Sequence, residues 1–176
     1  MNVLEECTTW LEKAVIGLNL CPFAKAVHSK GQIRWVLSDA TEPVALLELL
    51  VHELQHLAAA DPETTDTTLI VHPQVMRDFM DFNDFLGVAE DALAELDLDG
   101  VLQIASFHPQ FQFAGTDSED IMNATNRSPY PTLHLLREDS VERAVAAFPE
   151  AEDIFERNID TLQRLGPEGW KQLLLR

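Results

Sequence analysis

The chain has few of the residues that mark an exported, disulfide-linked or nucleic-acid-binding protein. Among 176 residues only Cys7 and Cys21 are cysteines, and 12 lysines and arginines face 30 aspartates and glutamates, a formal charge of −18. The two cysteines cannot form a disulfide framework, and a helix between them would hold them too far apart to pair. The negative charge repels nucleic acid and anionic lipid. We therefore expect neither a nucleic-acid nor a membrane partner.

Long apolar runs and a basic leader are also missing. The segment Met1–Glu6 is acidic where a secretory leader would be basic, and no apolar run approaches the roughly 20 residues that cross a bilayer. We therefore expect a cytoplasmic protein. Because neither a glycine-rich phosphate loop nor a dinucleotide fingerprint occurs, we also expect no ATP or NAD cofactor.

What the chain does contain is the composition of an ordinary globular domain. It is 46% hydrophobic and 24% charged, close to the average for folded proteins, and it is long enough to bury one core. Hydrophobic periodicity and turn residues predict the following strands and helices. The strands are 32–37, 67–71, 101–107 and 132–136, and the helices are 5–18, 43–60, 75–96, 140–147 and 151–165. Because alternating strands and helices imply parallel crossovers, we predict an α/β (or α+β) fold: a mostly parallel sheet of about four strands packed with helices, in a single domain spanning 1–176.

A zinc-hydrolase motif, HExxH, occurs at residues 52–56. In such motifs two histidines one helical turn apart hold the metal and the glutamate activates water. On a helical wheel, however, the leucines of this segment form one apolar stripe, and His52 and His56 lie on the far side. Since the sequence identifies no third ligand, we expect solvent-exposed histidines and no metal. A zinc-dependent hydrolase is kept only as a third hypothesis.

Two other histidines each end an apolar strand and precede a proline, in Val71-His72-Pro73 and Phe107-His108-Pro109. If the two strands are parallel, both histidines emerge at the carboxyl edge of the sheet, where ligands bind in open α/β folds. His108 is then a candidate general acid or base, and His72 a candidate ligand contact. The alternative is that each histidine bonds a neighbouring carbonyl and has only a structural role.

A connection of more than 20 residues, 109–131, separates the last two predicted strands. Connections of this length in a small domain are usually functional or disordered, and the aromatic anchors here argue against disorder. The end of the connection gathers Asn126, Arg127 and Ser128. Arg127, with Arg137 nearby, could grip a phosphate or carboxylate bidentately. The alternative is a surface turn with a salt-bridged arginine.

Acidic residues are absent from two segments of this acidic chain, 13–38 and 121–137. The basic residues of these segments are Lys13, Lys25, Lys30, Arg34, Arg127 and Arg137. If the segments meet in space, they predict an electropositive pocket.

Two further residues carry weaker signals. His134 alternates away from Leu133 and Leu135, so it lies on the other face of its strand and is either a ligand contact or a structural histidine. Cys21 follows the C-terminus of a predicted helix, where the dipole raises a thiol pKa. It is a weak candidate nucleophile, with inert packing as the alternative.

Three blocks of the sequence resemble one known family. They are residues 14–24 (AVIGLNLCPFA), 106–111 (SFHPQF) and 125–138 (TNRSPYPTLHLLRE). They are similar to the blocks of an uncharacterised bacterial family, domain of unknown function 1415, and the resemblance runs over essentially the whole chain. It implies a bacterial cytosolic protein and no particular activity. The HExxH segment lies outside the three blocks.

The leading hypothesis is a small-molecule enzyme or binder that accepts an anionic ligand at the carboxyl edge of the sheet. The alternative is a non-catalytic module that binds a protein partner or an effector through the same long connection. A deep pocket containing His108 and Arg127 would favour the first hypothesis, whereas an exposed apolar patch around Phe111 and Phe113 would favour the second. The sequence does not decide whether the protein is an enzyme, nor its oligomeric state.

Overall fold

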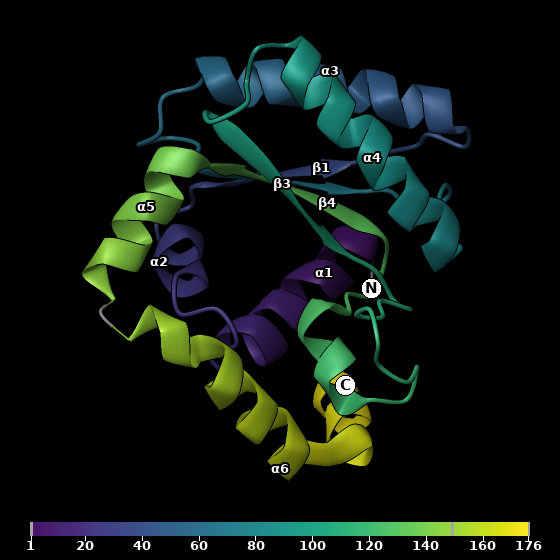
Figure 1. Ribbon diagram of the computed structural model, residues 1–176, viewed down its shortest axis with the longest axis vertical. Helices are drawn as coiled ribbons and strands as arrows, with labels where there is room; N and C mark the ends of the chain where they lie inside the picture. The colour runs from purple at the N-terminus through teal and green to yellow at the C-terminus, as the bar shows by residue number, and fades with distance from the viewer. Residues whose placement is uncertain (1, 149, 176) are drawn as a thin grey trace.

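The computed structural model describes residues 2–148 and 150–175, in which a four-stranded sheet lies between two layers of helices (Figure 1). One layer consists of α3 and α4, and the other of elements from both ends of the chain, among them the long helix α6. The strands are β1 Ile33–Leu37, β2 Thr67–Val71, β3 Leu102–Phe107 and β4 Thr132–Arg137. The helical elements are α1 Val3–Trp10, η1 Leu11–Ile16, α2 Ala24–Ser29, α3 Pro43–Ala59, α4 Phe79–Glu95, η2 Ile121–Asn126, α5 Glu138–Ala147, η3 Ala151–Asp153 and α6 Ile154–Leu174.

The sheet is mixed, so the prediction of a mostly parallel sheet is wrong. Its strand order is β1-β2-β4-β3, with β1 and β2 parallel and β4 antiparallel to both of its neighbours. The connection from β3 to β4 contains only the short η2 and no helix that carries the chain back along the sheet. It therefore stays at one edge, and β4 returns antiparallel. Because two reversals separate β2 from β3, these strands still point the same way.

The face of the sheet under α3 and α4 has a closed core. Apolar residues three and four apart along α3 point at the sheet, and Leu46, Leu50, Leu54 and Leu57 are fully buried there. They pack with Phe82, Ala89 and Leu93 of α4 and with Ile70, Leu133 and Leu135 of the strands. Complete burial of one such side chain stabilises the fold by about 2 kcal/mol. Most of the buried apolar side chains that the structure describes belong to this core.

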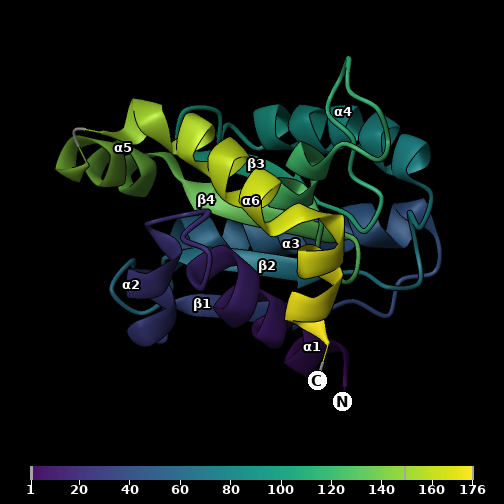
Figure 2. The ribbon, with the colours of Figure 1, turned by 90° about the horizontal axis from the view of Figure 1, so that it is seen from below.

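The opposite face is covered less completely. Trp10 of α1 packs edge-on against Phe107 at the end of β3, with ring centroids 5.1 Å apart, and α6 crosses the outside of this layer (Figure 2). Near its end α6 packs on η1 through Trp170 and Leu173, and Lys13 donates to the carbonyl of Leu175. Neither α2 nor α5, all of whose residues are described, has a fully buried side chain. Because α2 and α5 pack loosely, this face of the sheet is not completely covered by side chains.

Several element boundaries differ from the sequence prediction, and α2 was not predicted at all. The first helix begins at Val3 with a capping box between Asn2 and Glu5, and continues as the π-helix η1. The long amphipathic helix begins only at Phe79, after the Asp78 cap. The last helix runs on to Leu174 across a kink at Gly166, where φ is 70°. No helix of the described residues combines the length and apolarity needed to span a bilayer.

Candidate functional site

His72 and His108 emerge at the same edge of the sheet, as the prediction required. Both are fully buried and pack against the ring of Phe82, with centroids 5.4 Å and 5.3 Å away. Nε2 of His108 donates to the carbonyl of Met76 at 3.1 Å, and its Nδ1 accepts from the N–H of Gln110 at 3.0 Å. Burial lowers the pKa of His108. With both nitrogens held by the main chain, His108 has the geometry of the structural alternative.

His72 is held in a similar way. Its Nδ1 donates to the carbonyl of Val75 at 3.0 Å, while Nε2 is buried without a hydrogen-bond partner among the described residues. Burial lowers the pKa of His72 to about 4. The ring therefore stays neutral near pH 7 and fixes the turn after β2.

Arg127 links distant parts of the long connection 109–131 by hydrogen bonds. Its Nε donates to the carbonyl of Phe111 at 3.0 Å, and its Nη2 donates to that of Ser118 at 2.7 Å. Ser128 is buried, and its hydroxyl donates to the carbonyl of Tyr130. These groups, predicted to bind a ligand, stabilise the connection instead.

Arg137 and Arg127 lie at opposite ends of β4. Arg127 precedes the first residue of the strand, and Arg137 is its last residue. Its Nη2 donates to the carbonyls of Ala60 at 3.0 Å and Thr65 at 2.8 Å. The two arginines expected to hold one anion therefore do not meet.

In the HExxH segment the two histidines and the glutamate face different surroundings. His52 and His56 are exposed, as the helical wheel predicted, but Glu53 faces the sheet and is 2% exposed. Its carboxylate accepts two hydrogen bonds from Arg34, at 2.8 Å and 3.2 Å. Among residues 2–148 and 150–175, no cluster of three His, Cys, Asp or Glu side chains could hold a metal ion.

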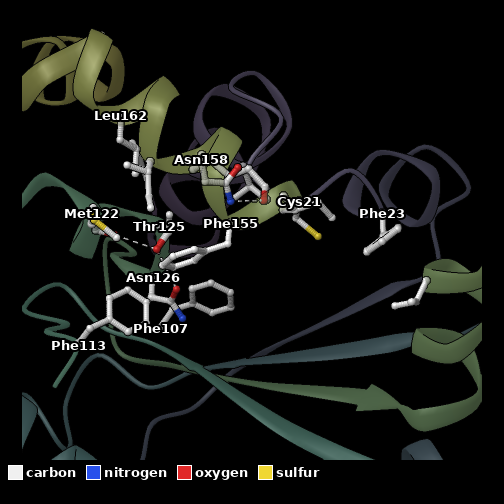
Figure 3. Close-up of a pocket in the computed structure, with 15 residues that line it drawn as sticks. Cys21, Phe23, Phe107, Phe113, Met122, Thr125, Asn126, Phe155, Asn158 and Leu162 are labelled. Carbon is white, nitrogen blue, oxygen red and sulfur yellow. Dashed lines mark hydrogen bonds between the residues drawn. The ribbon is translucent and has the colours of Figure 1, made fainter. Parts of the chain in front are cut away.

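The thinly covered face of the sheet contains two neighbouring cavities, mainly apolar. The first, which we call the sheet-side cavity, has a volume of about 380 Å³ and lies between the sheet and the short helices α1, α2 and α5. The second, the loop-side cavity, has a volume of about 530 Å³ and lies among η1, η2, α5 and α6 (Figure 3). Four residues line both: Val15, Cys21, Phe23 and Phe107. The two cavities therefore share a wall.

The loop-side cavity joins segments that are distant in the sequence. Asn158 of α6 donates to the carbonyl of Leu20 at 2.9 Å, which fixes the segment before Cys21 against α6 (Figure 3). Asn126, one of the residues predicted to bind a ligand, also lines this cavity, and its Nδ2 donates to the carbonyl of Ser106 at 3.1 Å. The two acid-free segments of the sequence do meet here.

The lysines and arginines of the two acid-free segments lie away from the cavities. None of the lysines or arginines that the structure describes lines either cavity. The absence of acids in both segments instead coincides with apolar lining, and the electropositive pocket does not form around these cavities.

His134 lies on the sheet face that lines the sheet-side cavity, opposite the face of Leu133 and Leu135, as the alternation predicted. Its Nε2 lies 2.8 Å from Oγ1 of Thr67, and that hydroxyl donates to the carbonyl of Leu135 at 2.6 Å. Since the only hydroxyl proton of Thr67 goes to a carbonyl, Nε2 must carry the ring proton and donate. Burial lowers the pKa of His134 to about 4, so the ring is neutral near pH 7.

Cys21 is half-buried between the two cavities and forms no disulfide. Burial raises the pKa of its thiol, and hydrogen bonds from the backbone of Phe23 and Ala24 only partly oppose this effect. Burial also raises the pKa of Cys7, to about 12. Both groups are thiols at neutral pH, a form that is poorly nucleophilic.

The polar end of the sheet-side cavity includes two residues that the sequence did not single out, Asp66 and Ser140. The hydroxyl of Ser140 donates to Oδ1 of Asp66 at 2.6 Å. Only the pairing of β2 with β4 and the packing of α5 bring these residues to the cavity that His134 also lines, so no local sequence pattern could have identified them.

Comparison with known proteins identifies the family. The chain belongs to the family described as Protein of unknown function (DUF1415), whose model matches residues 2–172. Searches of curated proteins and of solved structures found no match.

Proposed function

We propose that this member of the DUF1415 family binds a small, mainly apolar molecule in the sheet-side and loop-side cavities. The observation that carries this proposal is their size and lining: about 380 Å³ and 530 Å³, with apolar walls and a few converging polar groups. Close-packed interiors contain few voids larger than a water molecule, and ligand sites have this combination of size and lining.

As in the leading hypothesis, the ligand is a small molecule, but its site is the pair of cavities and not the carboxyl edge of the sheet. The arginines expected to bind an anion at the sheet edge are engaged with carbonyls. The cavities lie instead on the face of the sheet, where the candidate residues Cys21, Asn126 and His134 line the walls. Because the thiol of Cys21 is protonated and the imidazole of His134 is neutral, we propose binding rather than covalent catalysis.

The alternative of a protein-binding module has one observation in its favour, which lies at the rim of the cavities. Val145, Phe148 and Phe155 are 47%, 40% and 62% exposed, and an apolar side chain of a partner could contact them. By contrast, Phe111 and Phe113 are half-buried and contact each other edge to face, so they form no exposed patch. Saturable binding of a small molecule in the absence of any partner protein would favour the cavity function.

The test is fluorescence titration with Nile red, an uncharged dye without hydrogen-bond donors. The protein should bind it saturably, and the dye should raise the melting temperature because it binds only the folded state. Ala144 of α5 lines the sheet-side cavity and Ala146 of the same helix is exposed. We expect Ala144→Leu to weaken binding about tenfold or more, roughly 1.4 kcal/mol, and the matched control Ala146→Leu to leave it unchanged. No binding, or equal loss in both variants, would contradict the proposal.

A further inference from the structure

The polar end of the sheet-side cavity also indicates which class of molecule it accepts. This inference rests on the proposed binding function and deepens it. We infer that the occupant is a mainly apolar molecule whose polar end is a hydrogen-bond donor and not an anion, a hydroxyl or N–H group that donates to Nδ1 of His134.

The hydrogen bonds between β2 and β4 fix which nitrogen of His134 carries the proton. A carbonyl only accepts, so the hydroxyl of Thr67 must donate to Leu135, and His134 must then donate to Thr67 through Nε2. A neutral imidazole has one N–H, so Nδ1 carries a lone pair and no proton. The protein therefore presents an acceptor at this position.

The described residues supply no donor for this nitrogen. In the described part of the chain, no residue bonds to Nδ1 of His134, and the ring lines the cavity. Its neighbours across the sheet are Leu69 and Ala105, and the ring of Phe107 lies 5.9 Å away between centroids. An acceptor in apolar surroundings gains most from a partner that enters with the ligand.

The side chains of Asp66, Ser140 and Thr67, which also line this cavity, have no proton left to donate to a ligand. The hydroxyl proton of Ser140 is donated to Asp66, whose carboxylate lines the same cavity, and the proton of Thr67 is donated to Leu135. No described lysine or arginine lines this cavity; Arg143, whose Nη2 donates to the oxygen of Ser140 at 3.4 Å, lies outside the lining. The carboxylate and the lone pair would thus repel a phosphate or carboxylate. A hydroxyl or N–H group could instead donate a hydrogen bond to either of them.

The experiment compares three probes of similar length as competitors of bound Nile red: 1-nonanol, its isomer octyl methyl ether, which has no donor, and nonanoate. We expect 1-nonanol to displace the dye at a concentration at least five times lower than the ether, and nonanoate to be the weakest. In His134→Phe, which keeps a ring but removes the acceptor, the alcohol and the ether should differ by less than twofold. Nile red affinity in this variant verifies that the cavity is intact.

A second variant tests the arrangement rather than the ring. Thr67→Val keeps the shape of Thr67 but removes the oxygen that holds the proton on Nε2, so the preference for the alcohol should shrink there too. Equal displacement by all three probes in the native protein, or a preference that persists in His134→Phe, would overturn the inference while leaving the cavity function in place. Failure of Nile red to bind would overturn both.

Discussion

Nε2 of His134 donates a hydrogen bond to Oγ1 of Thr67 across the antiparallel pair β4 and β2, with 2.8 Å between the two atoms. This bond fixes the proton of a histidine that lines an apolar cavity on Nε2, and so leaves Nδ1 as a hydrogen-bond acceptor. The other predicted histidines, His72 and His108, are instead held by backbone carbonyls in the turn after β2.

The thiol of Cys21 should react slowly with N-ethylmaleimide at neutral pH. Burial raises the pKa of this thiol above its ordinary value of 9.0, and only the thiolate reacts. The rate should be below that of glutathione at pH 7 and rise about tenfold per pH unit up to pH 9. The measurement uses Cys7→Ala, in which Cys21 is the remaining cysteine, with Cys21→Ala as the control. A rate above that of glutathione at pH 7 would contradict this account.

Labelling of Cys21 should also block the cavities, because its side chain lines both of them. The labelled Cys7→Ala protein should bind Nile red at least tenfold more weakly than the same protein unlabelled. Unchanged dye affinity after complete labelling would place the dye elsewhere.

Stability should fall as the pH drops from about 6.5 to about 4, in part because of His72. Burial lowers the pKa of this histidine from 6.5 to about 4, so between these values the unfolded chain binds a proton that the folded protein does not. The contribution of His72 is therefore complete above pH 6.5 and is lost toward pH 4, by about 3 kcal/mol. Urea unfolding across this range should show a smaller pH dependence in His72→Phe. An identical dependence in the variant would refute the assignment.

Replacing Arg127 by methionine should destabilise the protein without affecting ligand binding. The guanidinium donates to two carbonyls of the long connection, and their loss should cost about 1–3 kcal/mol of unfolding free energy. Nile red affinity should not change, and phosphate should raise the melting temperature of native protein and variant equally little. A phosphate-dependent stabilisation that disappears in Arg127→Met would instead support an anion site at the sheet edge.

The HExxH segment should respond to mutation as a structural helix. Glu53 is buried and paired with Arg34, whose side chain is 39% exposed, so Glu53→Ala should cost about 2–3 kcal/mol, the partial exposure reducing the value for a fully buried pair. His52→Ala and His56→Ala should each change stability by less than about 0.5 kcal/mol. Stabilisation by zinc that His52→Ala abolishes would revive the hydrolase hypothesis.

Much of the fold could be predicted from periodicity. The strand 67–71 was predicted with its observed bounds, and the segments of α3 and α4 were identified because their apolar stripes repeat at helical spacing. The direction of β4 could not be predicted by the same reasoning, since it depends on whether the long connection crosses the sheet or stays at one edge. Short α2, which buries no residue completely, has no apolar stripe to mark it.

The candidate site was predicted only in part. Strand alternation placed His134 on the correct face, and the segment containing Cys21 and Asn126 does line a cavity. The arginines were misleading because an arginine can donate to carbonyls that only the fold brings close, as Arg137 does with Ala60 and Thr65. The contribution of Asp66 depends on strand pairing, which no short motif encodes.

The most direct test of the central claim is a map of backbone amide shifts in ¹⁵N-labelled protein titrated with 1-nonanol. If the molecule enters the proposed cavities, the largest shifts should occur in residues 20–24, 66–67, 105–107, 134 and 140–147. Shifts confined to residues 72–78, 108–111 and 127–130 would place the site at the sheet edge and contradict the account, as would the absence of any saturable shift.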